Sequence, residues 1–137
     1  MTSRLNPYLS FKDNTRAAMD FYKSVFGGEL TVSTFGEGGM AEDPAEADKI
    51  MHAQLVGTNG FWLMASDTPA KMGEPRANGQ ISLSGDDEAG LRGYWDKLSQ
   101  GGSVMMPLEK APWGDSFGML TDRFGTPWMV NIAGKQG

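Results

Sequence analysis

The sequence predicts an α+β fold of two tandem β-α-β-β-β modules, whose sheets form a partly open, β-barrel-like structure. Three observations predict it: hydrophobic patterns recur twice in the same order, each predicted helix ends at a Gly-Gly pair, and the halves match in sequence. A chain of 137 residues fits one domain. We therefore expect a single domain, with modules at 5–67 and 79–134 joined by a connector at 68–78.

The first module starts with a strand and a helix. Residues 5–11 alternate apolar and polar side chains, which is the period of a strand with one buried face. The side-chain oxygens of Asp13, Asn14 and Thr15 follow, and such oxygens can cap the first amides of a helix. The next apolar side chains recur with helical spacing: Ala18, Phe21, Tyr22, Val25 and Phe26. The glycines at 27–28 end the helix, because glycine readily adopts the left-handed conformation.

Three further strands complete the first module. The sequence predicts them at 28–37, 50–56 and 61–66. A glycine-rich, acidic loop at 36–49 separates the first two strands. The Asn-Gly pair within 58–60 predicts a tight hairpin between the last two, because both residues tolerate the positive φ that such turns require.

The second module repeats this order. A strand at 80–84 precedes a helix that the acidic residues 86–88 open and the glycines at 101–102 end. The apolar face of this helix consists of Leu91, Tyr94, Trp95 and Leu98. Three strands follow, at 103–108, 116–121 and 127–133. Residues 122–125 predict a tight turn between the last two strands.

The match between the halves indicates one duplicated module. A shift of 74 positions, from Leu9 to Leu83, superposes residues of the first strand, the helix and the Gly-Gly pair. The other identical pairs are Ser10 with Ser84, Asp13 with Asp87, Lys23 with Lys97, and 27–28 with 101–102. Near the end of each half, 61–64 also resembles 127–130.

Composition argues against two classes of partner. The net charge is −5 and the 12 basic residues are scattered, whereas a nucleic-acid-binding protein gathers them on one face. No apolar run approaches the ~18–20 residues that span a bilayer, so we expect no membrane partner. The N-terminus lacks the apolar stretch of a secretory signal, and there is no cysteine. These features favour a cytoplasmic protein.

The fold predicts a ligand pocket. A helix buries one face of each sheet, and the other face is concave because strands twist. Concave, largely apolar surfaces with a few polar groups are where small molecules bind. We therefore expect a small-molecule ligand.

The chain resembles the PhnB-like branch of the vicinal-oxygen-chelate superfamily, which includes glyoxalases, bleomycin-resistance proteins and dioxygenases. The resemblance rests on LNPYLSF…AMDFYKSVFGGEL, on MHAQLVGTNGFWLMASD and on PWGDSFGMLTDRFGTPWMV, and it covers nearly the whole chain. It implies a glyoxalase-like fold. It also implies a homodimer, because such modules often pair across chains to complete their barrels.

The resemblance further implies a position for a metal ion, and the residues there argue against one. The family's four ligands fall on Asn6, Leu63, Gln80 and Met129. Leu63 donates nothing, Met129 is a soft thioether, and the two amides are weak, neutral ligands for a divalent ion. We therefore expect no metal and no cofactor.

Six residues are our candidates for ligand contacts: Asn6, Tyr8, Gln80, Ser82, Trp113 and Met129. Trp113 lies in a loop, where its ring can stack on a flat guest. For the strand residues the alternative is ordinary alternation toward solvent or a subunit interface.

Three other residues can carry chemistry. His52, the only histidine, is either a general base or a structural, hydrogen-bonded residue, and we favour the second. Glu109 and Asp115 flank Trp113; a base with a raised pKa is one possibility, and solvated charge is the one we favour.

Three functions remain open at this point. The first is a metal-free protein that binds a small molecule, of the sequestering or drug-resistance type. The second is a divalent-metal-dependent lyase, isomerase or dioxygenase of the same superfamily. The third is a structural or regulatory dimer without a ligand. Whether the chain catalyses a reaction is not decided by its sequence.

Overall fold

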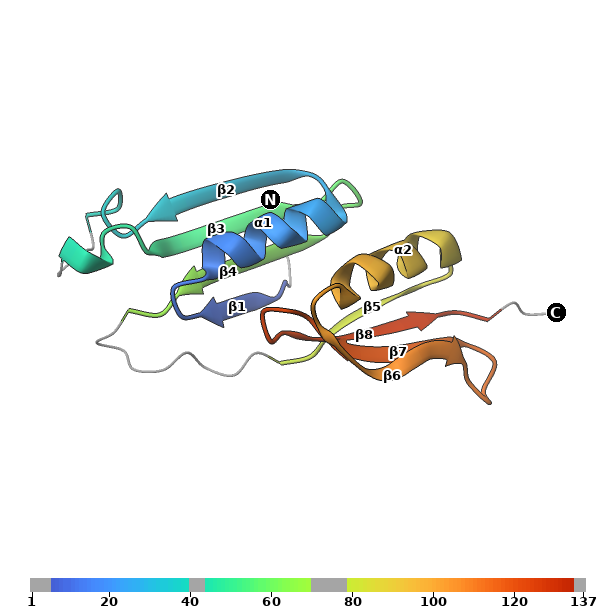
Figure 1. Cartoon of the computed structure of the whole chain (residues 1–137). Coiled ribbons are helices and arrows are strands. Elements are labelled where there is room, and N and C mark those ends of the chain that lie inside the picture. Colours follow the sequence, from blue (N-terminus) through green and yellow to red (C-terminus); the bar gives the residue numbers. More distant parts are fainter. Residues whose placement is uncertain (1–5, 40–43, 70–78, 135–137) are drawn as a thin grey trace. The chain divides into compact units, whose positions relative to one another are not determined.

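The computed structural model describes residues 6–39, 44–69 and 79–134 (Figure 1). They form two compact units, one within Met1–Ala77 and one within Asn78–Gly137. Leu5 and most of the connector predicted at 68–78 lie outside the described residues. The expectation of a single domain stays a prediction.

Unit 1 has one helix, one short 3-10 helix and four strands. Their bounds are β1 Tyr8–Phe11, α1 Thr15–Phe26, β2 Glu29–Thr34, η1 Pro44–Glu46, β3 Ile50–Val56 and β4 Trp62–Asp67. The sheet has the strand order β1-β4-β3-β2. Strands β1 and β4 run parallel, and the other neighbours run antiparallel.

Unit 2 repeats this arrangement. Its elements are β5 Ile81–Gly85, α2 Glu88–Ser99, β6 Ser103–Lys110, β7 Ser116–Thr121 and β8 Pro127–Ile132. The strand order is β5-β8-β7-β6, with β5 and β8 parallel. The prediction of two β-α-β-β-β modules in an α+β fold is confirmed, and neither four-stranded sheet closes on itself.

The register of the sheets confirms the internal repeat. Leu9 in β1 pairs with Ala65 in β4, and Leu83 in β5 pairs with Val130 in β8. All four side chains are buried. Residues 74 positions apart, such as Leu9 and Leu83, therefore occupy the same place in the two sheets.

The core of each unit lies between its helix and one face of its sheet (Figure 1). In unit 1, α1 packs on β2, β3 and β4 with its buried apolar side chains, which are Ala18, Met19, Tyr22, Val25 and Phe26. In unit 2, α2 buries Leu91, Trp95 and Leu98. Gly118 in β7 leaves room for Trp95, because an added Cβ there would lie 2.7 Å from that ring.

Among the described residues, no helix of its own unit covers the opposite face of either sheet, and we call these the open faces. Strand alternation and register assign their residues. The open face of unit 1 comprises Tyr8, Ser10, Glu29, Thr31, Ser33, His52, Gln54, Val56, Trp62, Met64 and Ser66. The open face of unit 2 comprises Ser82, Ser84, Met106, Glu109, Phe117, Met119, Thr121, Pro127, Met129 and Asn131.

A β-bulge interrupts the regular alternation of side chains at the start of β3. Regular alternation along the strand would put Ile50 on the same face as His52, and the structure does not. Ser33 pairs with His52 but the next residue, Thr34, pairs with Ile50, so one residue of β3 is left over. Such an extra residue turns the strand, and Ile50 enters the core with 3% of its surface exposed.

The two helices start in different ways. In α2 the prediction is confirmed, because the Asp87 carboxylate accepts a hydrogen bond from the Gly90 amide at 3.2 Å. In α1 the prediction of a local side-chain cap is wrong, because Asn14 makes no side-chain capping bond. The Thr15 amide instead donates to Asp67 Oδ1, 3.0 Å away and 52 residues along the chain.

Candidate functional site

The open face of unit 1 carries a hydrogen-bonded pair of side chains. Tyr8 Oη on β1 lies 3.3 Å from His52 Nδ1 on β3. The two ring centroids are 5.9 Å apart, with planes inclined by 34°. Tyr8 is 51% exposed, so its hydroxyl is accessible to a guest molecule. The expectation that His52 is hydrogen-bonded is therefore met, with a predicted ligand residue as its partner.

The open face of unit 2 is rich in thioethers. Met129 on β8 lies between Ser82 on β5 and Met119 on β7 in the sheet register. Met106 pairs with Met119 from the outermost strand, β6. Methionine is flexible and polarisable, and it adapts to guests of irregular or aromatic shape. This face can therefore pack against an apolar guest, with the Ser82 hydroxyl beside it.

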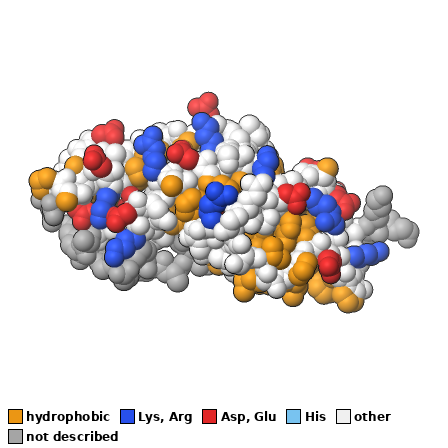
Figure 2. All heavy atoms as spheres, in the orientation of Figure 1, with side chains coloured by type: hydrophobic (Ala, Val, Ile, Leu, Met, Phe, Trp, Pro, Cys, Tyr) orange, Lys and Arg blue, Asp and Glu red, His pale blue; other side chains and the backbone are white. Residues whose placement is uncertain are grey.

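Trp113 extends this surface from the loop between β6 and β7. Its ring centroid lies 6.2 Å from that of Phe117, at an interplanar angle of 59°. The indole is 66% exposed, the same fraction as Met105 on β6. Figure 2 shows hydrophobic side chains along the lower edge of unit 2, where Figure 1 places β6. Trp113 therefore presents an accessible ring, as its loop position predicts.

Asp115 fixes this loop to the end of the sheet. Its Oδ1 accepts the Gly134 amide at 2.8 Å, and its Oδ2 accepts the Asn131 amide group at 3.1 Å. These hydrogen bonds lower the pKa of Asp115 below its usual value of 3.8, and the bond from Gly134 has the largest effect. The alternative of a base with a raised pKa is therefore wrong for Asp115, because its hydrogen bonds favour the charged form.

The lowered pKa of Asp115 predicts a contribution to acid stability. A group with a lower pKa in the folded state stabilises the fold above its unfolded pKa, and this contribution disappears as pH falls through the folded value. We expect Asp115→Asn to flatten the acid limb of the unfolding free energy between about pH 5 and pH 2. Urea unfolding across that range measures it, with exposed Asp96→Asn as the control. An identical acid limb in wild type and Asp115→Asn contradicts the assignment.

Asn6 and Gln80 lie just before β1 and β5, at equivalent places in the repeat. Asn6 Nδ2 donates to the carbonyl of its neighbour Pro7 at 3.1 Å. Gln80 is exposed. Within unit 2 the register places Ser82 beside Met129. Asn6 and Gln80 precede Tyr8 and Ser82 by two residues, and their part in a site stays a prediction.

The residues at the family's metal positions do not fit a divalent ion. Leu63 is on the helix side of β4 and 5% exposed, so its place in that set is wrong by one residue. Tyr8 pairs with Met64, as Ser82 pairs with Met129, and Met64 is therefore the counterpart of Met129. A slip of one residue reverses the face of a strand. The corrected set has two amides and two thioethers, which are poor donors to hard or borderline cations.

Within residues 6–39, 44–69 and 79–134, no three His, Cys, Asp or Glu side chains lie close enough together to hold a metal ion.

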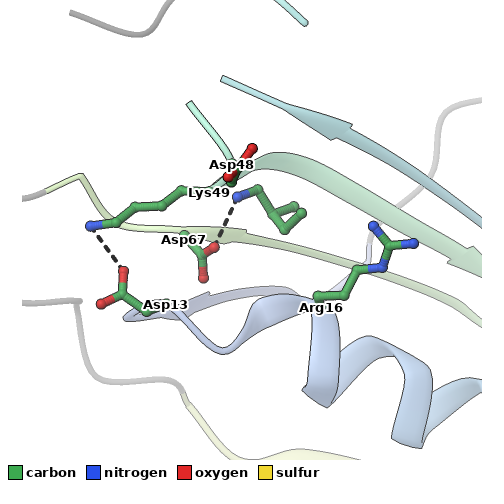
Figure 3. Close-up of a pocket in the computed structure, with 6 residues that line it drawn as sticks. Asp13, Arg16, Asp48, Lys49 and Asp67 are labelled. Atoms are coloured by element: carbon green, nitrogen blue, oxygen red, sulfur yellow. Dashed lines mark hydrogen bonds and ion pairs between the residues drawn. The ribbon is translucent and has the colours of Figure 1, made fainter. Parts of the chain in front are cut away.

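A separate pocket of about 330 Å³ lies at the start of α1 (Figure 3). Its lining residues are Asp13, Arg16, Asp48, Lys49, Ile50 and Asp67. Lys49 Nζ contacts Asp13 at 2.9 Å and Glu46 at 2.7 Å. Both contacts raise the pKa of Lys49, and the contact with Glu46 has the larger effect. Asp67 accepts the amides of Thr15 and Ile50. Because Lys49, Asp13 and Asp67 are already paired with groups of the protein, we assign the cluster a structural role.

Sequence reasoning missed several residues of the open faces. Met106, Met119 and Phe117 belong to the unit 2 face but resemble ordinary core residues in the sequence. The sequence did contain a signal for them. Successive side chains alternate between the two faces of the sheet along both β7 and β8, and Met129 on β8 was already a candidate. Extending that alternation across the predicted hairpin at 122–125 places Met119 opposite Met129.

None of the helices in the described part of the chain is long and apolar enough to cross a membrane.

Comparison with known proteins agrees with the fold. The chain is 42% identical to protein PA1353 from Pseudomonas aeruginosa, whose crystal structure superposes with a TM-score of 0.79, covering 96% of this chain and 98% of that one. It is 31% identical to Protein YjdN of Escherichia coli (strain K12), over 96% of this chain and 97% of that protein.

A third solved structure shares the fold at lower identity. It is the PhnB protein from Bacillus cereus, described as a putative 3-demethylubiquinone-9 3-methyltransferase. The TM-score is 0.73 at 24% identity, and the match covers 96% of this chain and 100% of that one. This PhnB protein therefore shares the fold of the chain, as the resemblance predicts. Residues 4–130 match the model of the Glyoxalase/Bleomycin resistance protein/Dioxygenase superfamily, and the chain therefore belongs to that superfamily.

Proposed function

We propose that this protein binds a small, partly aromatic molecule on its open sheet faces, without a metal ion. The observation that carries the proposal is the chemistry of these faces. They combine thioethers, aromatic rings, hydroxyls and amides, and their own helices leave them uncovered. Ligand sites have this composition: mostly apolar surface with a few polar groups that fix orientation.

Each proposed ligand residue has a role that its position supports. Trp113 and Met129 supply polarisable surface for a flat guest. Ser82 and Tyr8 supply hydroxyl groups, and Asn6 and Gln80 supply amides at the strand starts. The corrected donor set at the family's metal positions supports binding without a cation, because it offers neither carboxylate nor imidazole.

A ligand screen by thermal unfolding tests this function. We expect a subset of small aromatic compounds to raise the melting temperature, because a guest at 100 times its Kd stabilises the native state by about 2.7 kcal/mol. Trp113→Ala is expected to weaken such binding roughly tenfold, given ~0.5–1.5 kcal/mol for an aromatic contact beyond the area it buries. Lys97→Ala, exposed on α2, is the matched control. No shift across a broad library contradicts the proposal and favours a dimer without a ligand.

We also propose that the protein is a homodimer, in line with its family. Light scattering after size exclusion is expected to give twice the chain mass of 14.8 kDa. A mass of one chain at high concentration contradicts this.

A further inference from the structure

We propose that the Tyr8–His52 pair is a proton-linked anchor that selects guests carrying an acidic oxygen, such as a carboxylate. This inference rests on the proposed function, because it names the chemical class of the guest. Its starting point is the 3.3 Å contact between Tyr8 Oη and His52 Nδ1 on the open face of unit 1. This contact joins the only histidine of the chain to an exposed phenol.

The contact allows two arrangements of protons. With a neutral imidazole, the Tyr8 hydroxyl donates to Nδ1, and the single N–H of the ring then lies on Nε2. With a protonated imidazole, Nδ1–H donates to Tyr8 Oη, and the phenol hydrogen is released to point elsewhere. The charged state therefore offers a guest the phenol O–H, beside a positive charge.

An anionic guest stabilises the second arrangement. Its oxygen accepts the Tyr8 hydroxyl hydrogen, and its charge faces the imidazolium. Binding of the anion thus favours the protonated imidazole, which takes its proton from solvent, and no covalent bond is made or broken. Histidine is suited to this role because it gains its charge in the physiological pH range.

Among the described residues of unit 1, the register neighbours of the pair carry no charge. Ser33 pairs with His52 across the sheet, and Ser10 and Ser66 pair next to Tyr8. None of these neighbours is ionisable. The carboxylate on the same face is Glu29, which pairs with Val56 four residues along β3, or about 13 Å away. Glu37, in the turn beyond β2, is held by the amide and hydroxyl of Thr34.

Unit 2 does not offer an equivalent anchor. Glu109 pairs with Phe117 on its open face, and Asp115 contacts Asn131 there. Both are carboxylates, which repel an acidic guest. Ser82 takes the place that Tyr8 has in the repeat. Selection for an acid is thus assigned to unit 1 alone.

Matched pairs of acid and amide probes test the inference. The probes are benzoate with benzamide and indole-3-acetate with indole-3-acetamide, titrated calorimetrically at pH 6 and pH 8. The variants are Tyr8→Phe and His52→Gln, and Tyr94→Phe on α2 is the matched control. Calorimetry in two buffers of different ionisation enthalpy reports proton uptake.

We expect the acid to bind roughly tenfold or more tightly than its amide at pH 6, since hydrogen bonds to charged groups are the stronger ones. Net proton uptake should accompany binding of the acid and not of the amide, and the preference for the acid should shrink at pH 8. Both variants should bind acid and amide with the same Kd, while Tyr94→Phe should keep the wild-type preference for the acid.

Equal binding of acid and amide to the wild type overturns the inference, as does a preference that survives His52→Gln. If neutral compounds from the thermal screen bind but no acid does, the inference fails and the proposed function stands. If nothing binds in either experiment, both fail.

Discussion

Asp122→Ala is expected to lower the free energy of unfolding by about 3–5 kcal/mol, because it leaves three donors without an acceptor. Asp122 is 3% exposed at the turn between β7 and β8. Its Oδ1 accepts the Phe124 amide at 2.8 Å and the Thr126 amide at 3.1 Å. Its Oδ2 accepts Trp128 Nε1 at 2.9 Å.

The burial of these donors makes the loss large. Trp128 is 2% exposed and Thr126 is fully buried, so water replaces the carboxylate poorly. Each buried donor left unsatisfied costs about 1–3 kcal/mol. The indole of Trp128 also forms much of the core of unit 2, and its orientation depends on this bond.

Urea unfolding followed by tryptophan fluorescence measures the effect. Asp122→Asn keeps one acceptor oxygen and is expected to lose less than Asp122→Ala. Asp96→Ala, exposed on α2, is the control and should change stability by under about 0.5 kcal/mol. A loss for Asp122→Ala as small as that of the control contradicts the assigned role.

Asp67→Ala is expected to cost about 2–4 kcal/mol, because two amides lose their acceptor. Its carboxylate is 4% exposed and joins the start of α1 to the start of β3. Oδ1 accepts from Thr15 at 3.0 Å, and Oδ2 accepts from Ile50 at 2.8 Å. The carboxylate also faces the N-terminus of α1, where the helix dipole favours negative charge.

Hydrogen exchange tests this role residue by residue. In Asp67→Ala the amides of Thr15 and Ile50 should lose protection before the rest of unit 1. Asp20→Ala, exposed on α1, serves as the control and should leave both amides protected. Unchanged protection at both amides in Asp67→Ala contradicts the assignment.

The fold could be predicted from local patterns because it is built twice from the same signals. Alternation at Leu9 and Leu83 marks equivalent parallel strands, and the glycines at 27–28 and 101–102 end both helices. These signals act within a few residues, so the sequence contains them directly. The order of elements then follows from their repetition.

Contacts between distant residues could not be predicted in the same way. Asp67 caps α1 across 52 residues, and no local pattern indicates that partner. The bulge opposite Ser33 reverses the face of Ile50, and simple alternation does not include it. The corrected assignment of the family's metal position, from Leu63 to Met64, has a related cause. A shift of one residue in the register moves a side chain to the other face of a strand.

The sequence predicted which residue types belong to the candidate site better than it predicted which of them contact each other. Tyr8 and Trp113 are exposed, and Met129 lies in the sheet register between Ser82 and Met119. The partner of Tyr8 was not foreseen, because His52 follows it by 44 residues and becomes a neighbour only through the strand order β1-β4-β3.

Guest binding before and after removal of metal tests the central claim most directly. The protein should carry no polyhistidine tag, and the probe is the compound with the largest thermal shift. Its Kd is measured by calorimetry on untreated protein and on protein dialysed against EDTA. We predict the same Kd in both preparations, with no stoichiometric metal by elemental analysis. Binding that disappears after EDTA and returns with added Mn²⁺ or Zn²⁺ would contradict the account.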